Sequence, residues 1–250
     1  MLKREEIRIR DPFIYTDFEN KCYYMYGTTD LVDSRIVARN TFSVYRTYDL
    51  ENFEEPKIIF DGNKCEFWAD RDFWAPELHK YNGKYYLFGS CKAENKHRAT
   101  HIFVCDTPDG KFVPLTEDPI TPSDWECLDG TFWIENGKPY IVFSHEWTQV
   151  GDGEICAMQL SEDLRESVGD PFLYRECGKI KMLWSSFYNG RYLVVEAWSD
   201  TLNGKWQHSV SRFDFDGGHA MLFDTLDGTK MISLHSPNKA NFERAVFYRL

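Results

Sequence analysis

The sequence LDGTFWIENGKPYIVF, residues 128–143, decides the fold. It begins with an acidic residue and a short apolar run, passes through an Asn-Gly pair, and ends in an apolar, aromatic run. An Asn-Gly pair between two such runs is typical of a β-hairpin. A looser form of this pattern, with a small or acidic residue near the front and in most copies a Gly in the turn, recurs along the chain. The copies are DPFIYTDFENKCYYMY (11–26), WAPELHKYNGKYYLF (74–88), DPFLYRECGKIKMLW (170–184) and GHAMLFDTLDGTKMISL (218–234).

These copies predict a repeat fold. They recur at a spacing of roughly 40 to 65 residues, which indicates a solenoid, an array or a propeller. Helical periodicity is nearly absent. Short alternating or aromatic runs, beginning with residues 7–9, follow one another along the chain, as in antiparallel sheets. Turn pairs such as Asn82-Gly83 and Asn189-Gly190 lie between them and favour hairpins. We therefore predict one all-β domain over residues 1–250, a five-bladed β-propeller. The alternative is a β-sandwich in which the repeat is coincidental.

Composition restricts the class of partner. The chain has 250 residues, a formal net charge of -11 and 16% aromatic residues. Its length is sufficient to bury a full core. The acidic residues are spread along the chain, which argues against nucleic acid or an anionic membrane as partner. No apolar stretch approaches the roughly 18 residues that a membrane span needs.

The cysteines and the first residues indicate the compartment. The seven cysteines form no C-x-x-C pair and no His/Cys cluster at zinc spacing. We expect reduced thiols that pack in strands as small apolar groups. The opening MLKREE has no apolar signal segment, so we expect a cytoplasmic protein.

The residues at or near the start of each copy, which we call the repeat fronts, include candidate catalytic carboxylates. In a propeller, residues before the first strand and after the second strand of each blade share the rim of the central pocket. Asp11 and Asp129 are of the first kind and Glu146 is of the second. Glycoside hydrolysis needs one carboxylate that activates water and one carboxylic acid that protonates the leaving oxygen. Crowded carboxylates raise one another's pKa, which keeps the acid protonated near neutral pH.

Other residues near the fronts are candidates for substrate binding. They are Trp74, Glu77, His145, Trp147 and His219. The two tryptophans could stack on sugar rings, although each also suits a core. An Asp before a Pro is often only a turn residue, and His219 could equally be a loop histidine. Their joint placement at repeat fronts is what favours a functional site.

Four motifs, in order, resemble the blade fronts of glycoside hydrolase family 43: DPFI (11–14), FWAPE (73–77), LDGT (128–131) and GHAM (218–221). The resemblance covers nearly the whole chain and implies an inverting β-xylosidase, α-L-arabinofuranosidase or arabinanase on a five-bladed propeller. It implies that Asp11 is the general base and that Asp129 tunes and orients the general acid. It also implies that His219 lies near the propeller axis, where a calcium ion or a water would contact it. No cofactor is required.

The general acid departs from the family pattern. The family usually carries a Glu in a Glu-Gly-Pro sequence at the front of the fourth blade, where this chain has VGDP (168–171). One explanation is that Glu146, in the sequence HEW (145–147), is the proton donor. The other is that a shortened fourth blade has lost the donor and that Asp170 is a poor substitute. We predict Glu146.

The leading hypothesis is therefore an exo-acting, inverting glycosidase. Its substrate would be a short plant-derived oligosaccharide, from which it removes terminal arabinofuranosyl or xylosyl units. The alternative is a catalytically impaired carbohydrate-binding propeller. A mannoside phosphorylase would need a basic phosphate site, and no Arg/Lys cluster accompanies the fronts. Fructan-cleaving propellers usually open with Asn-Asp-Pro-Asn, which RDPF (10–13) does not match.

Overall fold

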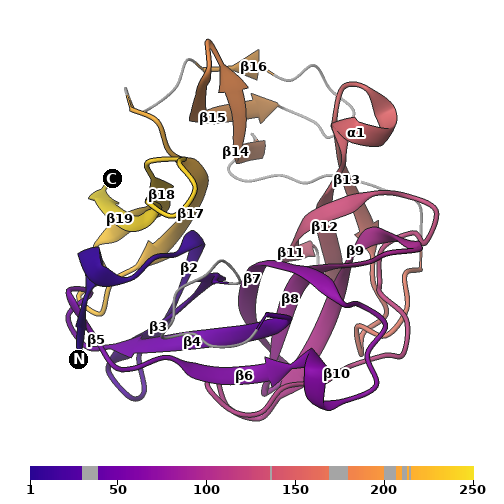
Figure 1. The fold of residues 1–250 in the computed structure, drawn as a ribbon, viewed down its shortest axis with the longest axis horizontal. Coiled ribbons are helices and arrows are strands. Elements are labelled where there is room, and N and C mark those ends of the chain that lie inside the picture. Colours follow the sequence, from indigo (N-terminus) through magenta and orange to yellow (C-terminus); the bar gives the residue numbers. More distant parts are fainter. Residues whose placement is uncertain (30–38, 136, 169–179, 200–206, 210–212, 214) are drawn as a thin grey trace. The chain divides into compact units, whose positions relative to one another are not determined.

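The computed structural model describes residues 1–29, 39–135, 137–168, 180–199, 207–209, 213 and 215–250. In this part of the chain the strands form five antiparallel sheets (Figure 1). The chain divides into two compact units. The first comprises Met1–Val37, Ser43–Lys57 and Arg175–Leu250, and the second comprises Ala38–Phe42 and Ile58–Tyr174. The single domain over residues 1–250 stays a prediction.

The first unit holds the sheets of the first, fourth and fifth repeats. The first sheet runs β1 (Leu2–Lys3), β5 (Asn52–Phe53), β4 (Thr41–Thr47), β3 (Cys22–Thr28) and β2 (Arg10–Asp17), with η1 (Arg4–Glu6) after β1. The fourth is β14 (Ile180–Tyr188), β15 (Arg191–Ser199) and β16 (Gln207–His208), and the fifth is β17 (Gly218–Asp224), β18 (Lys230–Ser236) and β19 (Arg244–Arg249). β17 packs beside β2, and an apolar core that includes Ile14, Met25 and Phe223 joins these two sheets.

The second unit holds the sheets of the second and third repeats. One sheet comprises β7 (Arg71–Tyr81), β8 (Lys84–Ala93), β9 (Lys96–Cys105) and β10 (Val113–Pro114), and the other β11 (Cys127–Glu135), β12 (Lys138–His145) and β13 (Glu154–Gln159). β6 (Lys57–Asp61) pairs with β4, and the remaining elements are η2 (Gly62–Lys64) and α1 (Trp147–Val150). Phe88, Ile141 and Phe143 are almost fully buried in the core shared by the two sheets. Each such side chain contributes about 1.5–3 kcal/mol by leaving water.

The predicted hairpin turns are confirmed where the structure describes them. Asn82 and Gly83 have φ values of 47° and 78°, and they connect the paired residues Tyr81 and Lys84. Asn189 and Gly190 repeat this geometry with φ values of 50° and 78°. Two-residue hairpins of this kind need positive φ at both central residues, which Asn and Gly adopt readily.

Two expectations outside the repeats had different outcomes. Residues 7–9 alternate apolar and polar as a strand does, but they form no strand in the structure, so that prediction was wrong. Ile7 and Ile9 are nevertheless buried in the core of the first unit. The alternation of apolar and polar residues therefore reflects the burial of these two side chains and not strand pairing. Six of the cysteines lie in the described residues and all six are free thiols, as expected; Cys177 lies outside the described residues. No helix in the described residues is long and apolar enough to cross a membrane.

The repeat fronts share one backbone conformation. The front residues with positive φ are Asp11 (52°), Ala75 (43°), Asp129 (56°) and His219 (57°), and each lies where the strand register shifts. Left-handed backbone at a residue other than Gly costs about 1–3 kcal/mol and is concentrated at functional sites. In the second sheet the residue with this conformation is Ala75. The predicted residues Trp74 and Glu77 are the paired residues on either side of that register shift. Asp170, the fourth front, lies outside the described residues.

Candidate active site

In the first unit, a buried carboxylate lies among two histidines and a threonine. Asp11 Oδ1 is 3.3 Å from His219 Nδ1 and 3.4 Å from His235 Nδ1. The Thr28 hydroxyl donates a hydrogen bond of 2.7 Å to Asp11 Oδ2. The structure therefore brings together Asp11 and His219, both predicted, and adds Thr28 and His235, which the sequence analysis missed.

The surroundings of Asp11 favour its ionised form. Burial works to raise the pKa of the Asp11 carboxyl, because a charge is poorly solvated away from water. Interactions with His219, His235 and Arg10 outweigh burial. The net effect is a pKa well below the ordinary value of 3.8. Asp11 is therefore ionised at neutral pH, which a general base requires.

A recurring hydrogen bond places the fronts. The Asp129 N–H donates to Ser90 Oγ at 2.9 Å, and the His219 N–H donates to Ser185 Oγ at 2.8 Å. Each acceptor lies on the neighbouring sheet of the same unit. The Asp11 N–H donates in the same manner to His235 Nδ1 at 3.3 Å. The fronts are thus attached through their amides, and the side chains of Asp11, Asp129 and His219 are not needed for this attachment.

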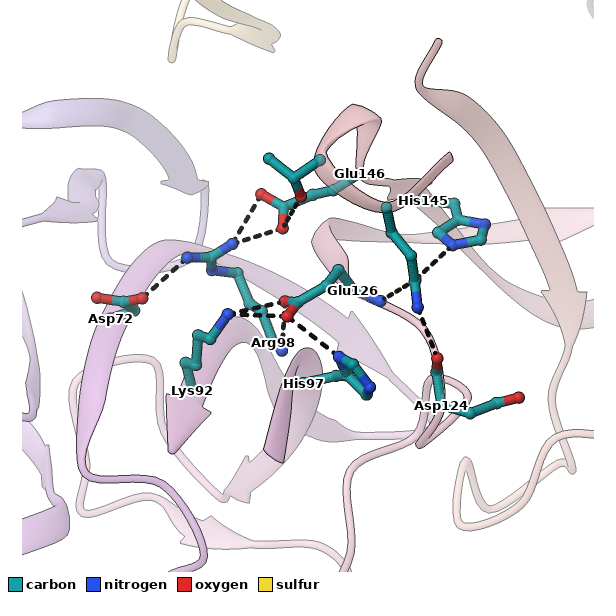
Figure 2. A network of polar contacts seen from close by, with 10 residues as sticks. Asp72, Lys92, His97, Arg98, Asp124, Glu126, His145 and Glu146 are labelled. Atoms are coloured by element: carbon teal, nitrogen blue, oxygen red, sulfur yellow. Dashed lines mark hydrogen bonds and ion pairs between the residues drawn. The ribbon is translucent and has the colours of Figure 1, made fainter. Parts of the chain in front are cut away.

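In the second unit, Arg98 of β9 contacts Asp72 and the predicted Glu146, as Figure 2 shows, and it also contacts the predicted Trp74. Arg98 Nη1 lies 2.7 Å and 2.6 Å from the two carboxylate oxygens of Glu146. Arg98 Nη2 donates to Asp72 Oδ2 at 2.8 Å, and the guanidinium lies 4.3 Å from the centre of the Trp74 ring. The side chains of Arg98 and Glu146 are only 10% and 11% exposed. Both Glu146 oxygens are therefore engaged by a buried cation, and Arg98 covers one face of Trp74.

A second carboxylate supports the loop that carries Glu146. Glu126 accepts hydrogen bonds from Lys92 Nζ at 2.9 Å and from the Arg98 N–H at 2.8 Å, and its Oε1 lies 3.1 Å from His97 Nδ1. Burial works to raise the pKa of Glu126, but these donors outweigh it and lower the pKa to about 2. The Glu146 N–H donates to the Glu126 carbonyl at 2.8 Å. The stretch just after β12 is therefore held in place before any ligand binds.

Three other predicted residues have defined surroundings. The His145 ring stacks on Trp125 with centroids 4.2 Å apart, and its Nε2 is 2.8 Å from Gln149 Oε1. Glu77 Oε2 lies 3.2 Å from His79 Nε2. Trp147 lies on α1 and is 69% exposed. Contact of these residues with substrate stays a prediction.

The family model for glycosyl hydrolases family 43 matches residues 6–248. The chain belongs to this family. Among solved structures, it resembles an endo-arabinase from Bacteroides thetaiotaomicron VPI-5482 at 34% identity, with a TM-score of 0.89, over 100% of this chain and 96% of that one. A thermostable family-43 glycoside hydrolase at 21% identity and TM-score 0.79 shares the fold. The predicted family and the five-bladed β-propeller fold are confirmed.

Curated relatives of this family 43 chain match over shorter lengths. A xylosidase/arabinosidase of Bacteroides ovatus is 24% identical over 216 residues, which are 74% of this chain and 61% of that protein. Xylosidase/arabinosidase 43A of Humicola insolens is 28% identical over 108 residues, 41% of this chain and 32% of that protein. The chain thus spans less than two thirds of the length of these relatives.

A calcium ion at His219 of this family 43 chain stays a prediction. Calcium takes about six to eight oxygen ligands, which can include backbone carbonyls and waters. His219 Nδ1 lies beside one carboxylate, that of Asp11. In the part of the chain that the structure describes, no group of three or more His, Cys, Asp and Glu side chains could hold a metal ion.

Arg98 and His235 escaped the sequence analysis for different reasons. Nothing in the sequence around Arg98 signals that its side chain is buried. His235 did carry a signal. It follows Gly228 of its hairpin at the same distance as Ser90 follows Gly83, so aligning the repeats through their turn glycines would have identified it as the equivalent of Ser90.

Proposed function

We propose that this family 43 chain is an inverting glycosidase that acts on arabinosyl or xylosyl linkages of plant-derived oligosaccharides. The observation that carries the proposal is the buried Asp11 carboxylate, kept ionised among His219, His235 and Thr28. Inversion needs such a carboxylate to take a proton from the attacking water. The names of the relatives, an endo-arabinase and a xylosidase/arabinosidase, support arabinose and xylose as the sugars.

In this proposal the carboxylates have separate roles. Asp11 is the general base, Asp129 tunes and orients the acid, and Glu146 donates the proton to the leaving oxygen. Trp74 and Glu146 both contact the Arg98 guanidinium. For Glu146 to act as the acid, substrate binding must release at least one of its oxygens from Arg98, since both accept hydrogen bonds from that guanidinium.

The test is a substrate panel with product analysis. Aryl α-L-arabinofuranoside, aryl β-D-xyloside, linear arabinan and xylan are each incubated with the protein. We expect arabinose or xylose to be released as single units, with the inverted anomer appearing first in the proton NMR spectrum. Mixed oligomers as first products would make the enzyme endo-acting. Turnover of none of the four substrates would overturn the proposal.

The role of Glu146 has its own test. We expect Glu146→Gln to lower hydrolysis of natural disaccharides by about 10²–10⁴-fold, the usual contribution of general acid catalysis. A dinitrophenyl glycoside should be spared because its leaving group needs no proton. Glu154→Gln, at an exposed residue of β13, is the matched control and should retain both activities. Equal activity of Glu146→Gln and the control on both substrates would exclude Glu146 as the acid.

One observation favours a second candidate function, a sugar-binding propeller without catalysis. If the bidentate ion pair with Arg98 persists when a saccharide binds, Glu146 has no free oxygen for proton transfer. Titration calorimetry with arabino- and xylo-oligosaccharides distinguishes the two functions. Saccharide binding with no product after prolonged incubation would support this second function.

A further inference from the structure

The residue that accepts the hydrogen bond from the Asp11 amide differs in type from the residues that accept the equivalent bonds from Asp129 and His219. The amides of Asp129 and His219 donate to serine hydroxyls, whereas the Asp11 amide donates to an imidazole nitrogen, His235 Nδ1. A hydroxyl can rotate about its own bond and adapt to its donor. A ring nitrogen accepts along one direction only, so its own placement decides where the donor must lie.

The hydrogen bonds assign the tautomer of His235. Since Nδ1 accepts the Asp11 N–H, it carries no proton, and the ring proton resides on Nε2. Nε2 lies 3.1 Å from Asn238 Oδ1 and therefore donates to it. Donation from Nδ1 to the Asp11 carboxylate, 3.4 Å away, requires a proton on Nδ1, so it replaces the amide bond when His235 is protonated.

The His235 ring is itself held from several sides. It is fully buried, and the Tyr192 ring stacks on it with centroids 5.7 Å apart at an angle of 16°. Asp216 accepts from the Tyr192 N–H at 2.8 Å and from the Asn238 N–H at 3.0 Å. One carboxylate thus fixes both neighbours of the imidazole, and the imidazole has little freedom to turn.

We propose that His235 is a positioning residue for Asp11: its Nδ1 holds the Asp11 amide and thereby maintains the left-handed backbone that directs the carboxylate. This inference rests on the proposed function, in which Asp11 is the base. A φ of 52° at Asp11 is unfavourable by itself and persists only where surrounding contacts enforce it. A displacement of a catalytic group by about 1 Å can cost about 10²-fold in rate.

Two substitutions of His235 test the roles of Nδ1 and Nε2 separately. In His235→Asn, the side-chain oxygen takes the place of Nδ1 and can accept the Asp11 amide. In His235→Gln, the longer side chain reaches toward Asn238 and leaves the Asp11 amide without its acceptor. We expect His235→Asn to keep kcat within about tenfold of the wild type and His235→Gln to lower kcat by about 10²-fold, with KM nearly unchanged.

The control is another buried histidine that accepts through Nδ1. His101 receives the Trp68 Nε1–H at 3.1 Å within the second unit, and its substitution tests the loss of a buried imidazole that does not contact the Asp11 amide. His101→Gln should lower the melting temperature and leave kcat unchanged. Equal kcat in His235→Asn and His235→Gln, with both variants folded, would overturn the proposal.

An NMR measurement on the wild type needs no activity. Nitrogen-15 shifts of the His235 ring should show a protonated Nε2 and an unprotonated, hydrogen-bonded Nδ1 at neutral pH. The opposite tautomer would overturn the proposal even if His235→Gln failed to fold. If the wild type hydrolysed no glycoside but showed the expected tautomer, the proposed function would fail while the Asp11–His235 contact would stand.

Discussion

Asp11→Asn lowers kcat by about 10²–10⁴-fold on aryl pentosides, the range that general base catalysis contributes. The amide has nearly the same shape as the carboxylate and can still accept the hydrogen bond that Thr28 donates to Asp11 Oδ2. It cannot take a proton from water. The loss should therefore fall on kcat at pH 7, with little change in KM, and steady-state kinetics on the purified variant measures both.

A matched control for this substitution exists in the same unit. Asp224 forms an ion pair with Lys230 near the surface, and Asp224→Asn should keep wild-type kinetics. Activity of Asp11→Asn equal to that of the control would remove Asp11 from the mechanism.

The depressed pKa of Asp11 also predicts how stability depends on pH. A carboxyl whose folded-state pKa lies below the ordinary 3.8 stabilises the fold above that value, and the contribution is lost as the pH falls through the lower folded-state pKa. Between about pH 4 and pH 2, the wild type should therefore lose more stability than Asp11→Asn. Thermal melts across this range provide the measurement, and parallel curves would contradict the expected environment of Asp11.

Arg98→Met is expected to lower the free energy of unfolding by about 3–5 kcal/mol, because it leaves Glu146 as a buried charge without its partner. The pair is almost completely shielded from solvent, with side-chain exposures of 10% and 11%. Met keeps most of the apolar stem of Arg98. The decrease in the free energy of unfolding therefore measures the contribution of the charge and its hydrogen bonds. Urea unfolding followed by fluorescence measures the change.

A double substitution tests the cause. In Arg98→Met/Glu146→Leu neither buried charge remains, and much of the stability should return, since apolar replacement of both partners is often neutral or stabilising. Lys230→Met breaks an exposed pair instead and should change stability by about 0–1 kcal/mol. A double variant as unstable as Arg98→Met alone would mean that packing or the contact with Asp72 dominates.

The Arg98 ion pair also bears on catalysis. The same contact that stabilises the fold occupies both oxygens of the candidate acid. Substrate binding would have to compete with Arg98 for Glu146. The Glu146→Gln comparison on two leaving groups, together with the stability of Arg98→Met, therefore separates a structural role of Glu146 from a chemical one.

The sequence by itself determined the repeat and its hairpins. Asn82-Gly83 and Asn189-Gly190 form the expected turns because positive φ is a local preference of Asn and Gly. It also identified Asp11, Asp129 and His219 as equivalent fronts, since their positions within the repeats coincide. In the second repeat the equivalent position is Ala75, which has no functional side chain, and a further register shift lies just before it, between Arg71 and Trp74.

Only the tertiary structure decided the partners of the candidate catalytic groups. Asp11 meets His235 across 224 positions of the chain, and Arg98 meets Glu146 across 48. No local preference encodes such pairs, because they depend on which sheets pack together and on the register of each strand. The recurring pattern of sequence thus indicated which residues stand at the fronts, and the packing of neighbouring sheets determined which side chains hold them there.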